Sequence, residues 1–397
     1  MMANRHAQAM SREKHKAKEL PQCDLWLSVV ALALIGIGLV MVASASISIA
    51  ERRELPQLYY FWRQLASVSL GGSLVFVLFK VPLKVWDRLS TPLLFTAILA
   101  LIVVLVPSLG HEVNGSMRWI KFGSISLQAS EPMKLAVIIY LASYLVRHRE
   151  HVRNEFVGFI KPIGVLTIIA ALLLLEPDFG AAAVLFGTAL GMLFLGGVPL
   201  VRFFAWGVVA ISALMTLTVL APYRLQRLMT FMDPWADPYA SGFQLTQALI
   251  AFGRGEWFGV GLGNSVQKLF YLPEVHTDFV FAVVAEELGV VGAVLIVVLF
   301  TFLVLRIFQL GGAAERREQI FAAYLIYGVG LLLGAQAFIN MGVNMGLLPT
   351  KGLPLPLLSY GSNNIVVTCA GLGIVLRAAY ETRFLSDTPR SEGPRYG

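Results

Sequence analysis

The sequence predicts an all-α integral membrane protein with about ten transmembrane helices and both termini in the cytoplasm. Of its 397 residues, 57% are hydrophobic and only 14% are charged, whereas a soluble domain carries roughly 25% charged residues. The apolar residues form runs of roughly 17 to 25, the length at which a helix crosses a hydrocarbon core about 30 Å thick. The alternating strands of roughly ten residues that are typical of a membrane barrel are not found. A soluble globular domain is therefore excluded.

The apolar runs define the spans in chain order. Residues 1–24 are polar and basic and are predicted to form a disordered cytoplasmic tail. The run at 25–50 is longer than the roughly 7–15 apolar residues of a signal peptide, so we expect an uncleaved first helix. The membrane domain, 25–380, continues with predicted spans at 65–79, 91–106, 132–146, 162–175, 181–198, 203–220, 279–305, 320–345 and 357–376. Residues 381–397 are predicted to be a cytoplasmic tail.

The orientation follows from basic residues, which gather in alternate loops and in both tails. The net charge of +7 is spread over these short segments, which argues against nucleic-acid binding. The segments predicted to be cytoplasmic hold Lys80, Lys84, Arg88, Arg147, Arg149, Arg153, Lys161, Arg202, Arg306, Arg316 and Arg317. The longest connection, 221–277, is then a large periplasmic loop, and loops of that length are uncommon unless they are functional. We therefore expect the chemistry at the outer face.

Asp278 opens the apolar run at 279–305, at the predicted boundary between membrane and water. One interpretation is a helix-capping or first-turn acid. The other is a general base acting on a polar group held beside a lipid. Glu286 and Glu287 lie deeper on the same helix and are either paired with neighbouring basic groups or part of a coupling site; the sequence leaves both alternatives open.

Two further segments carry residues suited to anionic phosphate. Arg118 and Trp119 suit the membrane interface, and the guanidinium of Arg118 also matches phosphate oxygens. Glu131 and Lys134 share a helix face. They form a local ion pair, or Lys134 binds an anionic phosphate as a point charge; the sequence leaves both alternatives open.

The remaining candidates lie in turns and in the long loop. Glu176 and Asp178 flank Pro177. One interpretation is that these residues simply form a tight turn; the other is that the two carboxylates hold a divalent cation. Gln244 and Gln247 lie in a short amphipathic stretch predicted to follow the membrane surface. The proline-rich segment at 348–356 contains Lys351 and requires burial or a cavity if it lies at membrane depth.

Taken together, these segments closely resemble the SEDS family (shape, elongation, division and sporulation), and most closely its members that act in cell division. The matching strings are NGSMRWI with KFG, QASEPMKL, EPDFG, the loop GFQLTQALIAFGRGEWFGVGLGNSVQKLFYLPEVHTDFVFA, and PTKGLPLPLLSYG, in family order. The chain departs from the family's usual SYGGSS at Ser362, Asn363 and Asn364, where packing or a partner contact is put in doubt.

The resemblance implies a ten-helix SEDS-type bundle and peptidoglycan glycosyltransfer that joins lipid II units at the outer leaflet. It assigns the family's essential aspartate to Asp278, and its other motif positions to Arg118, Glu131, Lys134 and Asp178. Lys268, Lys351 and Gln244 are added as candidate substrate-binding residues. No metal site is firmly expected, although Mg²⁺ or Mn²⁺ at the pyrophosphate would fit the chemistry. The implied partners are a class B penicillin-binding protein, which is a septal transpeptidase, and other membrane proteins of the division complex. The implied location is the bacterial cytoplasmic membrane at the division septum.

Two other functions remain open from the sequence. A flippase or transporter of lipid-linked precursors would place binding groups near the membrane midplane, where Glu286 and Glu287 are predicted. A non-catalytic scaffold of the division complex would use exposed apolar helix faces. Formation of glycan product by purified protein in detergent separates an enzyme from both.

Overall fold

A computed structural model describes residues 24–384, except 108–109, 114–115, 124, 220–225, 227–228, 241 and 351. The candidate residue Lys351 and most of the two predicted tails therefore lie outside the described residues. Each predicted span overlaps one long helix: α2 (Leu25–Arg52), α3 (Tyr59–Phe79), α4 (Leu83–Val104), α5 (Ser130–Arg147), α7 (Phe156–Leu175), α8 (Phe179–Leu195), α9 (Leu200–Val219), α12 (Val280–Arg316), α13 (Ile320–Asn344) and α14 (Ser362–Phe384).

The predicted all-α membrane fold is confirmed. Within the described part of the chain, seven of these helices are long and apolar enough to cross a membrane, and α8 and α9 supply shorter apolar helices. The last helix, α14, continues to Phe384, past the predicted end of the membrane domain at residue 380. Similarly, α12 continues to Arg316, past the predicted end at 305.

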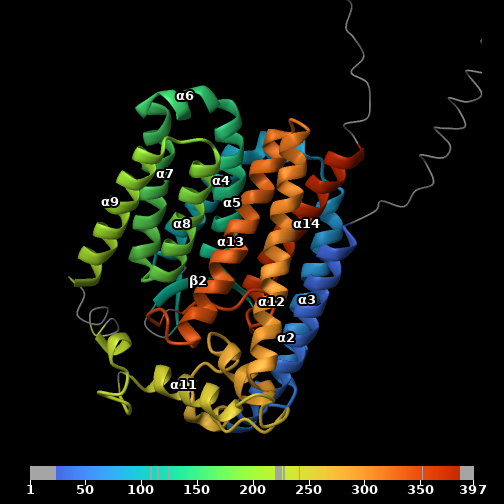
Figure 1. Ribbon diagram of the computed structural model, residues 1–397, viewed down its shortest axis with the longest axis vertical. Coiled ribbons are helices and arrows are strands. Elements are labelled where there is room, and N and C mark those ends of the chain that lie inside the picture. The colour runs from blue at the N-terminus through green and yellow to red at the C-terminus, as the bar shows by residue number, and fades with distance from the viewer. Residues whose placement is uncertain are drawn as a thin grey trace, which may run out of the picture.

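The helices pack as one bundle around a continuous apolar core (Figure 1). Helix α13 is surrounded by α5, α8, α12 and α14, while α14 also packs along α3. The short helix α6 (Arg149–Asn154) lies at one end of the bundle and α11 (Phe243–Gly255) at the opposite end. This separation agrees with the predicted opposite sides of the loops that contain them.

A small antiparallel sheet that the sequence did not predict lies between α4 and α5. It has the order β1 (Gly110–Val113), β2 (Ser116–Phe122) and β3 (Ile125–Gln128). Trp119 of β2 pairs with His111 on one side and Gln128 on the other. The segment that carries Arg118 and Trp119 is therefore a folded extramembrane sheet, and β2 packs against α4.

Helix α12 is broken at Gly289, whose φ of 69° and ψ of −167° are not helical. The loop between α11 and α12 pairs with the backbone freed by the break: the N–H of Val290 donates to the carbonyl of Glu256 at 2.9 Å, and the N–H of Val260 donates to the carbonyl of Glu286 at 2.9 Å. Non-helical backbone at membrane depth needs such internal partners. Part of the predicted periplasmic loop is thus built into the bundle.

The proline-rich segment between α13 and α14, residues 346–361, is called the strap below. Its Leu355, Leu357 and Leu358 are almost fully buried, as the sequence predicts for irregular backbone at this depth. The strap passes α2 at Gly38, where a Cβ atom would lie 2.8 Å from the carbonyl oxygen of Leu357. Glycine at position 38 therefore permits a close approach of helix and strap.

Candidate functional site

Asp278 lies immediately before α12, in a turn that packs against α13 and the strap. Its backbone carbonyl accepts hydrogen bonds from the Nδ2 atoms of Asn340 at 2.8 Å and Asn344 at 2.9 Å. Its carboxylate lies beside Gly352 of the strap, where a Cβ atom would be 3.3 Å from Oδ2. The residue is half-buried, so it stands at the junction of the protein interior and its surface.

The first turn of α12 is capped from another helix. The helix N-cap, Phe279, makes no side-chain cap hydrogen bond. Instead, the backbone N–H of Ala282 donates to Oδ1 of Asn344 at 3.1 Å. Asn344 of α13 thus caps the first turn of α12 from a neighbouring helix.

An aromatic cluster flanks this turn. The ring of His276 lies 5.2 Å from that of Tyr60 and 5.4 Å from that of Tyr360. Burial lowers the pKa of His276, against the opposing effect of Glu274. The imidazole is therefore neutral at physiological pH. In addition, the N–H of Tyr360 donates to the carbonyl of His276 at 2.8 Å, which joins the strap to the turn that carries Asp278.

Arg118 projects from β2 onto the turn between α7 and α8. Its Nε donates to the carbonyl of Glu176 at 3.2 Å, and its Nη2 donates to that of Pro177 at 2.6 Å. A guanidinium has five N–H donors, so these two contacts fix its place without exhausting its capacity for an anion. Trp119 is half-buried in the sheet.

The carboxylates of the same turn differ in their surroundings. Asp178 caps α8 through the N–H of Ala181 and accepts a hydrogen bond from Ser130 at 3.1 Å. Glu176 is fully buried, and neither carboxyl oxygen bonds to a described residue. Burial and the nearby Asp178 carboxylate raise the pKa of Glu176 to about 8, although Arg118 acts in the opposite direction. In this structure Asp178 therefore has the turn and capping role that the sequence offers for it.

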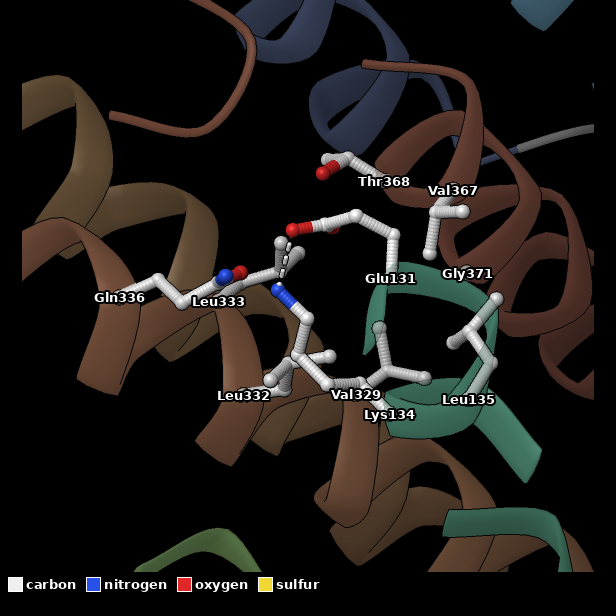
Figure 2. A pocket seen from close by; sticks show the side chains of 10 residues that line it. All are labelled: Glu131, Lys134, Leu135, Val329, Leu332, Leu333, Gln336, Val367, Thr368 and Gly371. Atoms are coloured by element: carbon white, nitrogen blue, oxygen red, sulfur yellow. Dashed lines mark hydrogen bonds and ion pairs between the residues drawn. The ribbon is translucent and has the colours of Figure 1, made fainter. Parts of the chain in front are cut away.

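Glu131 and Lys134 form an ion pair inside the bundle, with 2.8 Å between Nζ and Oε1 (Figure 2). Both are buried, and Asn364 of α14 donates to Oε2 of Glu131 at 3.2 Å. Gln336 of α13 points toward the pair across a cavity of about 10 Å³, roughly the room of one water molecule. The departure from the family pattern is accommodated here, because Asn364 is bonded to Glu131.

Lys268 lies in a second buried network, at the break in α12. Its Nζ is 3.2 Å from Oε1 of Glu287 and also contacts Ser44 of α2 and the carbonyl of Gly263. The adjacent Glu286 pairs with Arg254 at 3.1 Å. Both glutamates are fully buried.

Glu286 also accepts hydrogen bonds from Ser265 and from the N–H groups of Val266 and Gln267. Together, the two glutamates hold the outer loop to α12 and α2. Of the two alternatives that the sequence leaves open for them, the structure favours pairing with neighbouring groups.

The structure therefore brings together some candidates and separates others. Leu353 of the strap links the turn that carries Asp178 to the turn that carries Asp278. It packs against Gly180, just after Asp178. Its carbonyl accepts a hydrogen bond at 2.6 Å from Asn340, which also donates to the carbonyl of Asp278. Gln244 lies half-buried on α11, with the outer loop. Among the residues that the structure describes, no group of three or more His, Cys, Asp or Glu side chains is arranged to hold a metal ion.

Asn340 and Asn344 are the residues that sequence reasoning missed. The signal was present, because two amides spaced by four residues at the end of an apolar helix lie on one face and are costly to bury unpaired. They are inconspicuous in the sequence because the predicted span 320–345 that contains them is otherwise strongly apolar.

The comparisons with known proteins agree on one family. The family model described as a cell cycle protein, named for FtsW, RodA and SpoVE, matches residues 25–384. A probable peptidoglycan glycosyltransferase FtsW from Nitrosococcus halophilus is 52% identical over 371 residues, covering 94% of this chain and 96% of the relative. The FtsW of the same description from Pseudomonas fluorescens is 54% identical over 352 residues, covering 89% of this chain and 86% of the relative.

Solved structures show the same fold. One chain of a peptidoglycan synthase complex that coordinates polymerisation and crosslinking aligns with a TM-score of 0.75 and 30% identity, covering 91% of this chain and 99% of that chain. The crystal structure of the rod shape determining protein RodA of Thermus thermophilus aligns with a TM-score of 0.69 and 28% identity, covering 91% and 98%. This chain is a multi-pass membrane protein and belongs to the FtsW, RodA and SpoVE family of cell cycle proteins.

Proposed function

We propose that the chain is a peptidoglycan glycosyltransferase, which polymerises lipid II into glycan strands at the outer face of the cytoplasmic membrane during septal division. One observation carries the proposal: a half-buried aspartate, Asp278, stands beside the strap immediately before α12. The chain also covers nearly all of the relatives described as probable peptidoglycan glycosyltransferases.

In the proposed reaction, Asp278 acts as general base. It takes the proton from the 4-hydroxyl of an acceptor GlcNAc as that oxygen attacks the anomeric carbon of the donor sugar. The new glycosidic bond forms while the bond to undecaprenyl pyrophosphate breaks, and the leaving group keeps the electron pair. Pyrophosphate is a good leaving group, so the greatest demand is for cations that stabilise its developing charge.

The candidate cations differ in availability. Arg118 is half-buried in an extramembrane sheet and uses two donors on backbone carbonyls, which leaves others for a phosphate. Lys134 and Lys268 are each already paired with a buried glutamate. We therefore propose Arg118 as a pyrophosphate ligand, together with Lys351, which neighbours Gly352 in the sequence. In this scheme Glu131, Lys134 and Asp178 support the site from within the protein.

In this proposal Mg²⁺ or Mn²⁺ would act only as a counter-ion to the pyrophosphate of the substrate. No step is assigned to it. Activity measured with and without EDTA tests its contribution separately.

The transporter alternative loses its motivating observation. Glu286 and Glu287 are each paired with a basic side chain of the outer loop and are fully buried, so neither needs a transported ligand as partner. A partner role is compatible with catalysis, since the related peptidoglycan synthase complex couples polymerisation to crosslinking. We propose that a class B penicillin-binding protein pairs with this chain at the septum, alongside other membrane proteins of the division complex.

The test is polymerisation of purified lipid II by the full chain in detergent, alone and with a class B penicillin-binding protein. An enzyme makes glycan polymer although detergent micelles provide no second compartment. If neither preparation yields polymer, whereas the chain moves lipid II across a vesicle membrane, the transporter alternative replaces this proposal.

A further inference from the structure

The outer end of α13 carries two buried amides, Asn340 and Asn344, one helical turn apart. Their exposed fractions are 2% and 0%. Buried amides are costly unless their hydrogen bonds are made. Both direct their Nδ2 groups to the backbone carbonyl of Asp278.

Asn340 joins two segments that are far apart in the sequence. Its Nδ2 donates to the carbonyl of Asp278 at 2.8 Å and to the carbonyl of Leu353 in the strap at 2.6 Å. An amide nitrogen has two hydrogens, so one is available for each carbonyl. This side chain therefore joins the strap to the turn that carries Asp278, in addition to the backbone hydrogen bond from Tyr360 to His276.

Asn344 holds the same turn from its other side. Its Nδ2 donates to the carbonyls of Asp278 and Asn340, both at 2.9 Å. Its Oδ1 accepts from the N–H of Ala282 and so caps α12. The carbonyl of Asp278 therefore receives two donors, which matches its two lone pairs and fixes the peptide plane from which the side chain departs.

The strap reaches the carboxylate at the next residue. Gly352, adjacent to Leu353, lies so close to Asp278 that a Cβ atom there would be 3.3 Å from Oδ2. A shift of the strap or of the turn would change this distance directly. The two amides thus bind the main chain of Asp278, and Asn340 also binds the strap that faces its carboxylate.

We infer that Asn340 and Asn344 are positioning residues for the reaction: they hold Asp278 and the strap at the separation that general-base catalysis requires. This inference rests on the proposed function. The competing explanation is that the amides only stabilise the bundle. The two explanations differ in kinetics, since misplacement of a catalytic group by about 1 Å can cost on the order of 10²-fold in rate, whereas a purely structural loss removes active molecules without changing the rate of those that remain folded.

The experiment compares Asn340→Ala with Tyr144→Phe in the full chain. The control also removes a buried side-chain donor to a backbone carbonyl, because the hydroxyl of Tyr144 donates to Gly158 at 2.7 Å. However, that bond lies near the opposite end of the bundle. Initial rates of lipid II polymerisation are measured against lipid II concentration, per folded molecule, with the class B penicillin-binding protein present.

We expect Asn340→Ala to lower kcat by roughly 10²-fold and to leave KM within about twofold of wild type. Tyr144→Phe should lose a similar amount of thermal stability to Asn340→Ala but keep the kcat of wild type. Asn340→Ser retains one donor and should fall between them. If Asn340→Ala does not fold, Asn340→Ser and Asn344→Ser are judged by the same criterion. Wild-type kcat in the asparagine variants, with an active wild type, overturns this inference alone. An inactive wild type overturns the proposed function and the inference with it.

Discussion

Two acidic sites at the same end of α12 are held in opposite ways. Glu287 and its neighbour Glu286 are fully buried, and their carboxylates are bound by Lys268 and Arg254. Asp278 is half-buried, and the two amides of α13 bind its backbone carbonyl. The difference indicates a division of labour: carboxylates consumed by pairing secure the outer loop, while the acid at the boundary is oriented through its main chain.

The largest effect on stability is expected from Glu287→Gln. It leaves the buried ammonium of Lys268 without its charged partner, and breaking such a pair costs about 3–5 kcal/mol of unfolding free energy. The double variant Lys268→Met with Glu287→Gln should regain most of this loss, because no uncompensated charge remains. Thermal unfolding in detergent measures both. A single variant as stable as wild type would contradict the structural role of the buried pair.

The double variant also tests Lys268 as a substrate ligand. If the lysine serves only the pair, polymerisation returns with stability. If the protein is stable but inactive, Lys268 contacts substrate and the division between the two acidic sites is less complete than the structure indicates.

A smaller loss of stability is expected from Gly289→Ala at the break in α12. The φ of 69° disfavours a side chain, and the new Cβ would collide with the backbone N of Gly259. We expect a cost of about 1–3 kcal/mol, read as a fall in Tm. Gly36→Ala is the matched control, since nothing lies within 4 Å of a Cβ there. Equal Tm values for the two variants would argue against a rigid break.

Gly352→Ala should affect the outer site with little effect on stability. The added methyl group lies at 3.3 Å from the carboxylate of Asp278, so the two must separate by a few tenths of an ångström. We expect polymerisation to slow by roughly 3–10-fold, less than for a full 1 Å displacement, with Tm near that of Gly36→Ala. An unchanged rate would show that the strap does not constrain the carboxylate.

A further effect concerns Glu176 and depends on pH. Burial raises its pKa from the ordinary 4.5 to about 8, so between these pH values the folded state keeps a proton that the unfolded chain has lost. The stabilisation from this group is therefore fully present below pH 4.5 and is lost as the pH rises to 8. Glu176→Gln should match wild type near pH 5 and exceed its Tm at pH 8–9. Parallel Tm curves over this range would contradict the raised pKa.

The sequence was sufficient for the spans because apolar length is a local property. It also located Asp278 and the strap, since an acid at the start of an apolar helix and a proline-rich segment are visible in the chain itself. The sheet was missed, although Asn114-Gly115 is a hairpin signal between β1 and β2 in the sequence. Its strands are short and lie between strongly apolar spans.

The partners of the charged residues could not be predicted. Glu287 pairs with Lys268 and accepts a hydrogen bond from Ser44. These three residues lie in three distant segments of the chain, and no spacing rule connects them. The same holds for Asn340, whose two carbonyl partners come from the α12 turn and the strap. Contacts of this kind follow from the packing of the bundle, which only the tertiary structure defines.

The most direct test of the central claim is lipid II polymerisation by Asp278→Asn, in the preparation that gives polymer with wild type. The substitution keeps the shape of the side chain and the backbone carbonyl that Asn340 and Asn344 bind, but it removes the base. We predict a loss of rate of about 10²–10⁴-fold, the range for general-base catalysis, with Tm unchanged. Polymerisation at the wild-type rate by folded Asp278→Asn would contradict the account.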